Sequence, residues 1–552
     1  MVQKIIDIDH PVHTEESNPK AMAPCLTPAD GDGTRDEELL QQRQMYAYQW
    51  HSENAPGVPL LKELPLREFF SPKYLILSGA EIAKIGINHE LSELGAPDKA
   101  SSLAQVNHLY VTLDTPASAE QSWWATDESF GEQRLSGANP VLLQRVTSEQ
   151  QLGLFEGLAA HDDAVFQQVR GCLRDDNLYV VDHVHILENC TSDRIDGKRL
   201  PKTAALFWYN KWDERLLPLA IRIDDEVVTA KDTQRWLHAK LGFQAADGVV
   251  HEMRSHLGQT HLVMGACAIA MKRNLHARHP VSCLLTPHFR FMLALNNTAE
   301  KTLIAPGSDV ANSFGLPIAQ VVGVAKDAFD SFSLHDAALP RQLQLRGVDN
   351  VKKLPHYPYR DDALLLWEAI VDYVHHTLGL YYDEAHFALD VESRRWLEEL
   401  GRSADDDGAG LGGVQVPTTL AEYVELVATM VFTCSAQHSA VNFTQYAYLA
   451  YPPNSSFALW ADPDDVDFLQ NLPPLEPARG QIGTLRQLTA FRYDVLGDYA
   501  HKYTTDPDAN HAIAVFQKRL AAVEEEIGKR NQLRWRTYEV LRPSLVTNSI
   551  SI

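Results

Sequence analysis

Residues 249–280, VVHEMRSHLGQTHLVMGACAIAMKRNLHARHP, are the most informative part of this sequence. They predict one long helix that ends where His279 meets Pro280, because a proline disfavours helical geometry in the residue before it. From Leu262 to Met271 the helix is apolar on nearly all sides. We therefore expect it to run through the middle of a large core.

Two histidines, His256 and His261, lie within this apolar helix. In a regular α-helix, at about 100° per residue, side chains five positions apart diverge by about 140°. The two imidazoles can bind one metal ion only if the helix accommodates an extra residue, as in a π-bulge, and such bulges often mark functional sites. The alternative is two buried histidines that each hydrogen-bond to a carbonyl group, and the pair alone does not decide between these interpretations.

The composition is that of an ordinary globular protein, with 552 residues, 45% of them hydrophobic and 22% charged. The formal net charge of −24 argues against nucleic acid as a partner, because nucleic-acid binding requires clustered Lys and Arg. It also gives no general attraction to anionic lipid surfaces. The N-terminus lacks the apolar core of a signal peptide, and no apolar run approaches the roughly 20 residues of a membrane helix.

The six cysteines are scattered along the chain without a CxxC motif. This spacing indicates reduced, mostly buried thiols and predicts a cytoplasmic protein. They are Cys25, Cys172, Cys190, Cys267, Cys283 and Cys434.

The chain divides into a polar beginning and a helical body. Residues 1–60 are rich in Pro, Asp, Glu, Gln and Gly and short of periodic apolar positions, which predicts a flexible or surface-draped arm. From residue 60 the pattern becomes helical. Short β-like runs at residues 177–185, 204–209 and 217–223 predict a small sheet set into a mostly helical body.

A second core helix is predicted to begin at Thr419, where Thr419 and Glu422 form a capping box. It continues into SAQHSAVNFTQY, in which His438 and Asn442 lie one turn apart on the same face. At this spacing two side chains can converge on a single ion. The alternative is a buried polar pair whose members satisfy each other.

The chain ends in Ile550-Ser551-Ile552, a small and largely apolar ending, whereas chain termini are usually frayed and polar. Such a tail can enter a groove in the body and carry the carboxylate of Ile552 inside. A buried carboxylate without a partner is very unfavourable, so we expect a cation beside it.

The polar groups collected in this way are three imidazoles, one amide oxygen and, if the tail is buried, one main-chain carboxylate. No thiolate belongs to the set, which argues against a cysteine-type zinc site. Several nitrogens and a carboxylate around an open position suit non-haem iron.

Several segments resemble the lipoxygenase family. They are residues 251–297, the segment FTCSAQHSAVNFTQYAYLAYPPNS, the terminal NSISI, YPYRDDALLLWEAI at residues 357–370, and DESFGEQRLSGANP at residues 127–140. The resemblance covers nearly everything after about residue 65, and the motifs occur in family order. It implies a mainly α fold: a lipoxygenase-like helical catalytic domain, at residues 61–552, around two long core helices with a small β-sheet insertion.

The resemblance also implies an iron site and a reaction. The implied ligands are His256, His261, His438, Asn442 and the carboxylate of Ile552, and the outer residues that orient them are Gln445 and Glu252. The implied reaction is dioxygenation of a polyunsaturated fatty acid of the linoleate, linolenate or arachidonate class with O2. An iron-bound hydroxide, without a separate side-chain base, takes a bis-allylic hydrogen, and a conjugated hydroperoxide is released.

The substrate pocket is less completely matched. Ala299 occupies the position where the family has Ala or Gly, and alanine there is associated with S products. Leu303 and Leu496 resemble residues that grip the pentadiene. The alternative for both is an ordinary core leucine, and it is equally favoured for Leu496, where the match to the family is gapped. Residues around Ser313 and Phe314 are expected to tune the position of oxygenation.

Two departures from the family pattern shape the expectations. Thr298 replaces a basic residue that many animal members use to meet the fatty-acid carboxylate, so this anchor is not carried over and tail-first entry becomes feasible. Plant and animal members begin with a β-barrel domain, whereas here about 60 residues precede the helical body. We therefore expect a lone, monomeric catalytic domain, as in short bacterial members, with at most weak membrane contact.

Three other functions remain as alternatives. The first is a fatty-acid hydroperoxide isomerase on the same scaffold, which the sequence does not distinguish from a dioxygenase. The second is a zinc hydrolase, against which the absence of an H-E-x-x-H motif counts. The third is a non-catalytic lipid binder with a structural metal.

Overall fold

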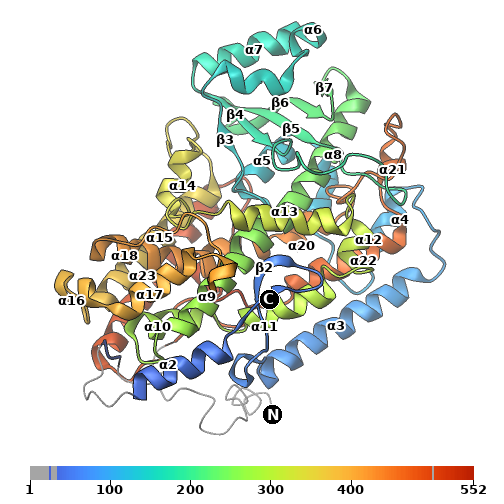
Figure 1. Ribbon diagram of the computed structural model, residues 1–552. Helices are drawn as coiled ribbons and strands as arrows, with labels where there is room; N and C mark the ends of the chain where they lie inside the picture. Colours follow the sequence, from blue (N-terminus) through green and yellow to red (C-terminus); the bar gives the residue numbers. More distant parts are fainter. Residues whose placement is uncertain (1–23, 27–33, 500–502) are drawn as a thin grey trace.

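A continuous helical rod from Thr233 to Asn274 forms the centre of the protein. The computed structural model describes residues 24–26, 34–499 and 503–552. The rod consists of α8 (Thr233–Val250), the π-helix η5 (His251–Leu262) and α9 (Val263–Asn274), and it is drawn in green in Figure 1. Almost every side chain of η5 and α9 is buried, which confirms the prediction of a helix through the core.

The ends of this rod differ from the prediction. It begins at Thr233, earlier than expected, and stops at Asn274, because Leu275 adopts an extended backbone conformation. Pro280 begins a new helix, α10 (Pro280–Leu285), in which the His279 side chain accepts a hydrogen bond from the Val281 backbone N–H. Proline at the first helical position is favourable since its missing N–H has no partner there anyway. Pro280 therefore starts a helix and does not end the preceding one.

The extra residue that a metal ion shared by His256 and His261 requires is present as a π-helix, which favours the metal-binding interpretation of the pair. The π-helix lies directly on α13 (Ile318–Asp330) at Gly258. A Cβ atom at Gly258 would approach the Cβ of Ala328 to 2.6 Å and the carbonyl oxygen of Ala325 to 2.9 Å. Only glycine therefore allows this close approach between the two helices.

We expect the substitution Gly258→Ala to lower the free energy of unfolding by about 1–3 kcal/mol, the usual range for overpacking a core. The added methyl group must push η5 away from α13, and urea denaturation measures the effect. Gly323→Ala is the matched control, because Gly323 lies on α13 itself and faces open space. Equal stability of the two variants would contradict the close packing at Gly258.

The small sheet is an antiparallel meander in the order β3-β4-β5-β6-β7. Its strands are β3 (Gln144–Arg145), β4 (Leu178–Asp182), β5 (Thr203–Asn210), β6 (Arg215–Ile223) and β7 (Glu226–Val228). Leu178 and Val180 face an outer cluster that includes Val169 of α7 (Asp163–Arg174), whereas Tyr179 and Val181 face the main core. The sheet thus lies between α7 on its outer side and the helical body, as Figure 1 shows at the top of the molecule. All three predicted strands are confirmed.

The second core element consists of α18 (Leu420–Phe432), the short π-helix η8 (Thr433–Gln437) and α19 (His438–Asn442). The predicted N-cap is present, since the Thr419 hydroxyl accepts from the Glu422 N–H at 3.2 Å. The Glu422 carboxylate accepts from the Thr418 N–H, one residue earlier than the predicted capping box requires. The element brings α19 against η5.

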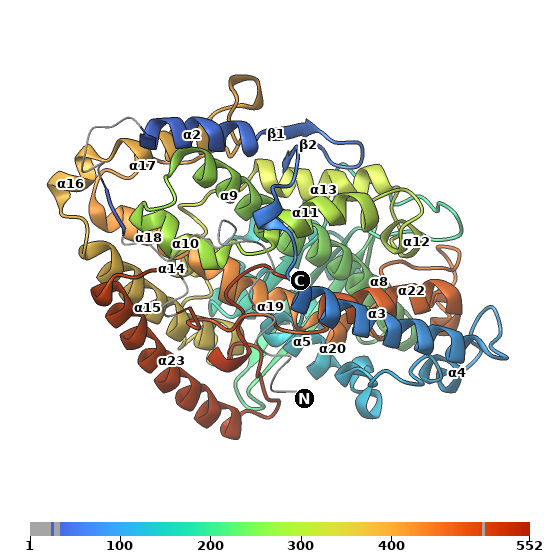
Figure 2. The same cartoon turned by 90° about the horizontal axis from the view of Figure 1, so that it is seen from below.

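The described part of the predicted arm contains regular structure. It comprises α2 (Thr34–Met45) and an antiparallel hairpin of β1 (Tyr48–His51) and β2 (Pro56–Leu61), which Figure 2 shows along one edge. The Arg43 side chain donates to the Asn274 Oδ1 at 2.7 Å, which ties α2 to the end of the rod. Residues 1–23 and 27–33 lie outside the described residues. The division at residue 60 stays a prediction, and β2 runs across it.

The remaining α-helices complete the body around these two elements. They are α3 (Pro72–Glu93), α4 (Leu103–Asn107), α5 (Asp127–Ser136), α6 (Leu158–His161), α11 (Met292–Thr302), α12 (Asp309–Ser313), α14 (Leu339–Leu345), α15 (Pro358–Gly379), α16 (Glu384–Leu389), α17 (Val391–Gly401), α20 (Gln445–Leu449), α21 (Phe468–Asn471), α22 (Leu475–Leu488) and α23 (Pro507–Leu533). Within the described ranges, no helix is both long enough and apolar enough to cross a bilayer.

Candidate metal centre

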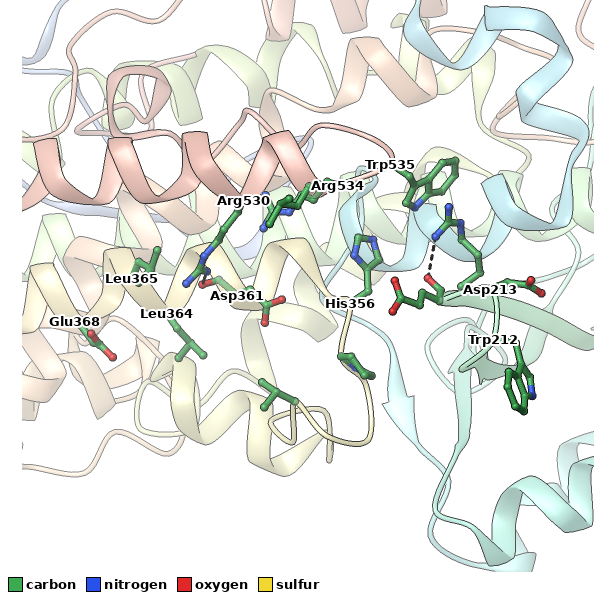
Figure 3. Close-up of a pocket in the computed structure, with 15 residues that line it drawn as sticks. Trp212, Asp213, His356, Asp361, Leu364, Leu365, Glu368, Arg530, Arg534 and Trp535 are labelled. Atoms are coloured by element: carbon green, nitrogen blue, oxygen red, sulfur yellow. Dashed lines mark hydrogen bonds between the residues drawn. The ribbon is translucent and has the colours of Figure 1, made fainter.

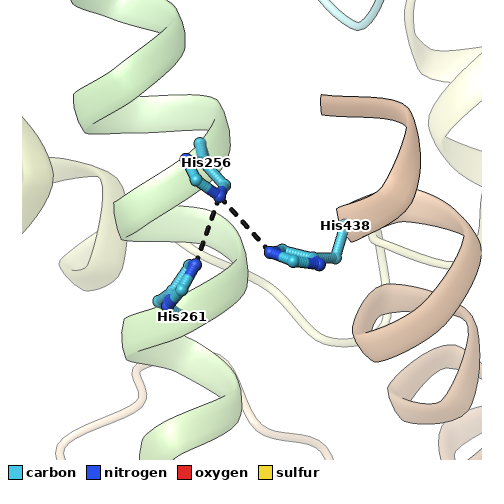
Figure 4. A group of neighbouring side chains, drawn as sticks. All are labelled: His256, His261 and His438. Atoms are coloured by element: carbon cyan, nitrogen blue, oxygen red, sulfur yellow. Dashed lines mark hydrogen bonds between the residues drawn. The ribbon is translucent and has the colours of Figure 1, made fainter. Parts of the chain in front are cut away.

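Three imidazoles meet at the contact between the two core elements. His256 and His261 extend from η5, and His438 extends from the start of α19, as Figure 4 shows. The Nε2 atom of His256 lies 3.2 Å from that of His261 and 3.3 Å from that of His438. All three side chains are buried. Within the described residues, this is the one group of three or more His, Cys, Asp or Glu side chains that is close enough to share a metal ion.

The spacing of these nitrogens fits a shared ion. Metal–imidazole bonds are about 2.0–2.1 Å long, so two such nitrogens lie about 3.0 Å apart at a right angle and about 3.4 Å apart at a tetrahedral angle. The observed distances of 3.2 and 3.3 Å fall in this range. The Nδ1 atom of His438 is buried without a hydrogen-bond partner among the described residues. The cluster therefore has the geometry of a metal site and does not satisfy its own hydrogen-bonding groups.

Burial keeps the three imidazoles neutral. Burial is the main cause that lowers the pKa of all three rings: the pKa of His256 is lowered, the pKa of His261 falls to about 3, and the pKa of His438 falls far below its ordinary value. Repulsion between the rings lowers the pKa of His261 and His438 further. A neutral imidazole carries the lone pair that a metal ion needs. At neutral pH the cluster is therefore in its metal-binding protonation state.

The orientation of His261 is set by Asn296 on α11. The Asn296 amide nitrogen donates to the main-chain oxygen of His261 at 2.8 Å, which directs its Oδ1 atom toward the Nδ1–H of the same histidine at 3.1 Å. The Nε2 lone pair of His261 is thereby directed into the cluster. The sequence reasoning missed Asn296, because a bond across 35 positions leaves no local signal.

We expect Asn296→Ala to lower the affinity of the cluster for a metal ion by about 10–100-fold, the usual effect of removing a hydrogen bond that orients a metal ligand. Competition with a chelator measures the affinity. Thr298→Ala is the control, since Thr298 is exposed on the same helix and its hydroxyl donates only to the Ala294 carbonyl oxygen. Wild-type affinity in the Asn296 variant would show that His261 needs no such support.

Asn442 is linked to the cluster through Gln445. The Gln445 Nε2 atom donates to the Asn442 Oδ1 at 2.9 Å and lies 3.4 Å from the Nδ1 of His256. The Asn442 amide donates in turn to the Leu488 carbonyl oxygen at 2.8 Å, which directs its oxygen away from that contact. The structure thus brings three of the predicted residues together in one buried network.

Glu252 lies one turn before His256, with 3.5 Å between its Oε2 and the His256 Nδ1. Burial raises the pKa of this carboxyl group, but the neighbouring His251 and His256 outweigh the burial and lower it to about 2. His251, a residue that the sequence reasoning did not single out, donates to the Val441 carbonyl oxygen at 2.8 Å. It therefore joins η5 to the residue that precedes Asn442.

The C-terminal tail enters the body as predicted. Ile552 is buried, and the C-terminus lies near the middle of the molecule in both Figure 1 and Figure 2. The tail is held upstream, where the Thr547 N–H donates to the Ser439 hydroxyl at 3.2 Å and the His288 Nδ1 donates to the Asn548 carbonyl oxygen at 2.7 Å. Ser439 is the neighbour of His438, so the tail lies against the helix that carries the third imidazole.

The motif at residues 127–140 supports the rod just before the cluster. Arg134 of α5 donates to the Asp247 carboxylate at 2.8 Å, and Asn139 donates to the same group at 3.1 Å. The Ser255 hydroxyl, next to His256, donates to the Asn139 Oδ1 at 2.9 Å. All these side chains are buried, so the network fixes η5 relative to α5 and α8.

A small, mostly apolar cavity lies beside the cluster. Its lining consists of Glu252, Met253, Leu303, Asp309, Val310, Ser313, Phe314, Phe457, Gln481, Thr484, Leu485 and Leu488. Glu252 thus borders both the cavity and His256. Of the predicted pocket residues, Leu303 lines this cavity, whereas Ala299, on α11, and the buried Leu496, whose N–H donates to the Val546 carbonyl oxygen, are outside the lining.

A larger surface groove of about 1680 Å³ lies elsewhere, between the β5–β6 turn, α15 and the end of α23. Figure 3 shows Trp212, Trp535 and His356 toward one end of the groove and Arg530 and Leu365 toward the other. None of the cluster histidines lines it. Glu252, which contacts His256, lines the smaller cavity and does not line this groove, so the candidate chemistry lies at the smaller cavity.

A helical body with a buried three-histidine cluster next to an apolar cavity suits a class of protein that holds a metal ion beside a lipophilic ligand. The family model named Lipoxygenase matches residues 75–539. The chain belongs to the lipoxygenase family, and the resemblance seen in the sequence is confirmed.

Individual relatives agree with this assignment. A Pseudomonas aeruginosa linoleate 9/13-lipoxygenase is 30% identical over 82% of this chain and 70% of its own length. The allene oxide synthase-lipoxygenase protein of Plexaura homomalla is 28% identical over 95% of this chain, which spans 53% of that protein. The crystal structure of a coral 8R-lipoxygenase is 29% identical, with a TM-score of 0.86 over 97% of this chain and 83% of its own. The mainly α lipoxygenase-like fold is therefore confirmed.

Proposed function

We propose that this protein is a non-haem iron dioxygenase that converts polyunsaturated fatty acids of the linoleate, linolenate or arachidonate class into conjugated hydroperoxides. The observation that carries the proposal is the buried cluster of His256, His261 and His438 beside an apolar cavity, in a chain of the lipoxygenase family. The similarity to a linoleate 9/13-lipoxygenase supports the substrate class.

We assign the iron to His256, His261, His438, Asn442 and the carboxylate of Ile552. Nitrogen, amide oxygen and carboxylate donors suit iron, and the absence of thiolates from the set argues against a cysteine-type zinc site. When bound, the iron supplies the one-electron redox chemistry that allows a bis-allylic hydrogen to be removed. Gln445 and Glu252 orient the ligands through the contacts to Asn442 and His256.

The cavity provides the binding surface for the fatty-acid substrate. Met253, Leu303 and Phe314 offer apolar surface to the fatty-acid chain, and the burial of Met253 and Phe314 keeps water from that side of the cavity. Glu252 lies at the point where the cavity meets the cluster. The cluster imidazoles are neutral, so their lone pairs are available to a metal ion, and we assign no separate side-chain base to the hydrogen removal.

Simultaneous measurement of oxygen uptake and conjugated-diene absorbance tests this proposal. Iron-loaded protein receives linoleate and a trace of hydroperoxide, and we expect equal rates of oxygen consumption and diene formation after a short lag. If iron-loaded protein consumes no oxygen but rearranges added hydroperoxide, the isomerase alternative replaces the dioxygenase. Zinc in place of iron, with hydrolytic activity, would overturn the metal assignment.

We assign S configuration to the product on the basis of Ala299. We expect Ala299→Gly to raise the proportion of R hydroperoxide severalfold, because a glycine opens space for oxygen on the other side of the pentadiene. Chiral chromatography of the products measures this ratio. Ala305→Gly, a few residues further along the chain and outside the cavity lining, is the control. An unchanged chiral profile in the Ala299 variant would remove this residue from stereocontrol.

We also infer a monomeric, cytoplasmic enzyme with at most weak membrane contact. One chain provides all the proposed ligands, which supports a monomer. Cys172, Cys190, Cys267, Cys283 and Cys434 form no disulfide with one another, which suits a reducing compartment. The net charge of −24 opposes binding to anionic lipid.

A further inference from the structure

Lys198 is a buried lysine, 6% exposed, that none of the reaction chemistry described above uses. Its ammonium group donates to the main-chain oxygens of Ala311 at 2.7 Å and Asn312 at 2.5 Å. Within the described part of the chain, no carboxylate forms an ion pair with it. Burial lowers the pKa of Lys198 to about 8, so the group stays protonated at neutral pH and keeps its three donors.

The two acceptors belong to the last turn of α12. Carbonyl oxygens at a helix C-terminus have no partner within the helix and must be satisfied from outside. A lysine that caps such carbonyls fixes the position of the helix end. Lys198 therefore holds the C-terminal end of α12 from the loop that leads to β5.

The residues that follow this helix end form a wall of the cavity. Ser313 and Phe314 both line it, and the Phe314 ring packs on the ring of Phe457, with 4.7 Å between centroids. A wall that moves by about 1 Å is enough to change how a substrate lies relative to the reacting centre. The position of the α12 end therefore matters for the cavity.

The chain around Lys198 contacts the same wall from outside. A Cβ atom at Gly315 would lie 2.4 Å from the carbonyl carbon of Arg199, so the two backbones touch. Arg199 and Leu459 exchange two main-chain hydrogen bonds of 2.9 Å, and the Gly315 N–H donates to the Phe457 carbonyl oxygen at 3.1 Å. The segments that contain Arg199, Gly315 and Leu459 are thus in close contact next to Phe314. Lys198 adds the side-chain contact to α12.

We propose that Lys198 is a positioning residue that sets the depth of the substrate cavity and thereby the carbon at which the fatty acid is oxygenated. The proposal rests on the proposed dioxygenase function. Lys198 acts through Ala311 and Asn312 on Ser313 and Phe314. Without the ammonium group, the two carbonyl oxygens lose their partner, the end of α12 shifts, and the chain enters the cavity to a different depth.

The variants Lys198→Met and Lys198→Gln test this proposal. Methionine keeps the length of the side chain and removes its charge and donors, whereas Lys198→Arg restores both. Lys202→Met is the matched control, because Lys202 lies on the same segment, is half-buried and donates to the Glu188 carbonyl oxygen, away from α12. Iron content is measured for each, together with kcat, KM, the ratio of regioisomeric hydroperoxides and deuterium exchange at residues 309–315.

We expect the neutral Lys198 variants to keep their iron and to change the regioisomer ratio by about fivefold, somewhat less than the effect of a missing methylene in a specificity pocket. Deuterium exchange at residues 309–315 should increase, Lys198→Arg should return the ratio toward wild type, and Lys202→Met should leave it unchanged. A purely structural role would lower stability without changing the ratio.

Three outcomes would overturn the proposal. Active neutral variants with the wild-type ratio would show that Lys198 does not set the cavity depth. Loss of folding in both neutral variants would make Lys198 a residue of stability and not of selectivity. A wild-type protein that forms no hydroperoxide would remove the proposed function itself, and this failure is distinguishable because it appears before any substitution is made.

Discussion

Replacing His261 with alanine is expected to abolish stoichiometric iron binding and to reduce oxygen uptake by at least about 100-fold. Removing a residue that only orients a metal ligand lowers metal affinity or activity by about 10–100-fold. Removing the ligand itself is expected to have a larger effect. The His261 Nε2 lies 3.2 Å from that of His256, and Asn296 directs it there from the other side of the ring. No other described histidine is close enough to replace it in the cluster.

His238→Ala provides the matched control for this variant. His238 is a buried histidine on α8 of the same rod, and burial, which lowers its pKa to about 4, keeps it neutral as well. Both substitutions remove a buried imidazole and leave a comparable void, but only one of them touches the cluster. Iron measured by elemental analysis should be lost from the His261 variant alone. If that variant retained one iron per chain with full turnover, the assigned coordination would be wrong.

Adding a single glycine after Ile552 is the second change with a large expected effect. One residue displaces the terminal carboxylate by roughly 3.3–3.6 Å, well beyond the length of a metal–oxygen bond. The side chain of Ile552 is buried, and hydrogen bonds hold the tail at Thr547 and Asn548. The tail therefore cannot shift along its groove to accommodate the added residue. We expect iron occupancy and oxygen uptake to fall together, while the circular dichroism of the helical body is retained.

Ile552→Val is the control for the extended chain, because it changes the side chain at this position and keeps the carboxylate in place. The electron paramagnetic resonance signal of the oxidised enzyme should be close to wild type in this control and altered in the extended protein. A wild-type signal and full activity in the extended protein would remove the carboxylate of Ile552 from the ligand set.

The π-helix is the part of the site that local sequence rules could predict. Two histidines five positions apart within an apolar helix meet only if the helix widens, and η5 provides this widening. The N-cap at Thr419 and three of the five strands of the meander were predictable for the same reason, because each depends on residues within one turn or on alternation along one strand.

The extent of the rod was not predictable from the same pattern. The prediction began at residue 249, but the helix already begins at Thr233 and carries polar side chains such as Lys240 and Asp247 into the protein. Asp247 is acceptable there because Arg134, Asn139 and His183 surround it, and these partners lie more than 60 positions away in the chain. When the partners of a buried polar residue are this far away in the sequence, the residues next to it in the sequence look like those of a helix turn that faces solvent.

Asn296 and Lys198 illustrate the same limit within the site. Asn296 acts on His261 across 35 positions, and Lys198 acts on Ala311 across 113 positions. Neither belongs to a recognisable spacing, and an asparagine or a lysine is ordinary on a helix or in a loop. Only the folded structure shows that Asn296 orients the imidazole of His261 and that Lys198 contacts the end of α12 beside the cavity.

The distance along the chain between His256 and His438 has a consequence for how the protein is made. The two residues are 182 positions apart, so bringing them together closes a very long loop, and the entropy of that closure must be supplied by the core. In a zinc finger, ligands close in sequence let the metal drive folding. Here hundreds of residues must fold before the three rings meet. If the proposed site binds iron, we therefore expect the supply of iron to set the fraction of active molecules, whereas the hydrophobic core sets the fraction of folded molecules.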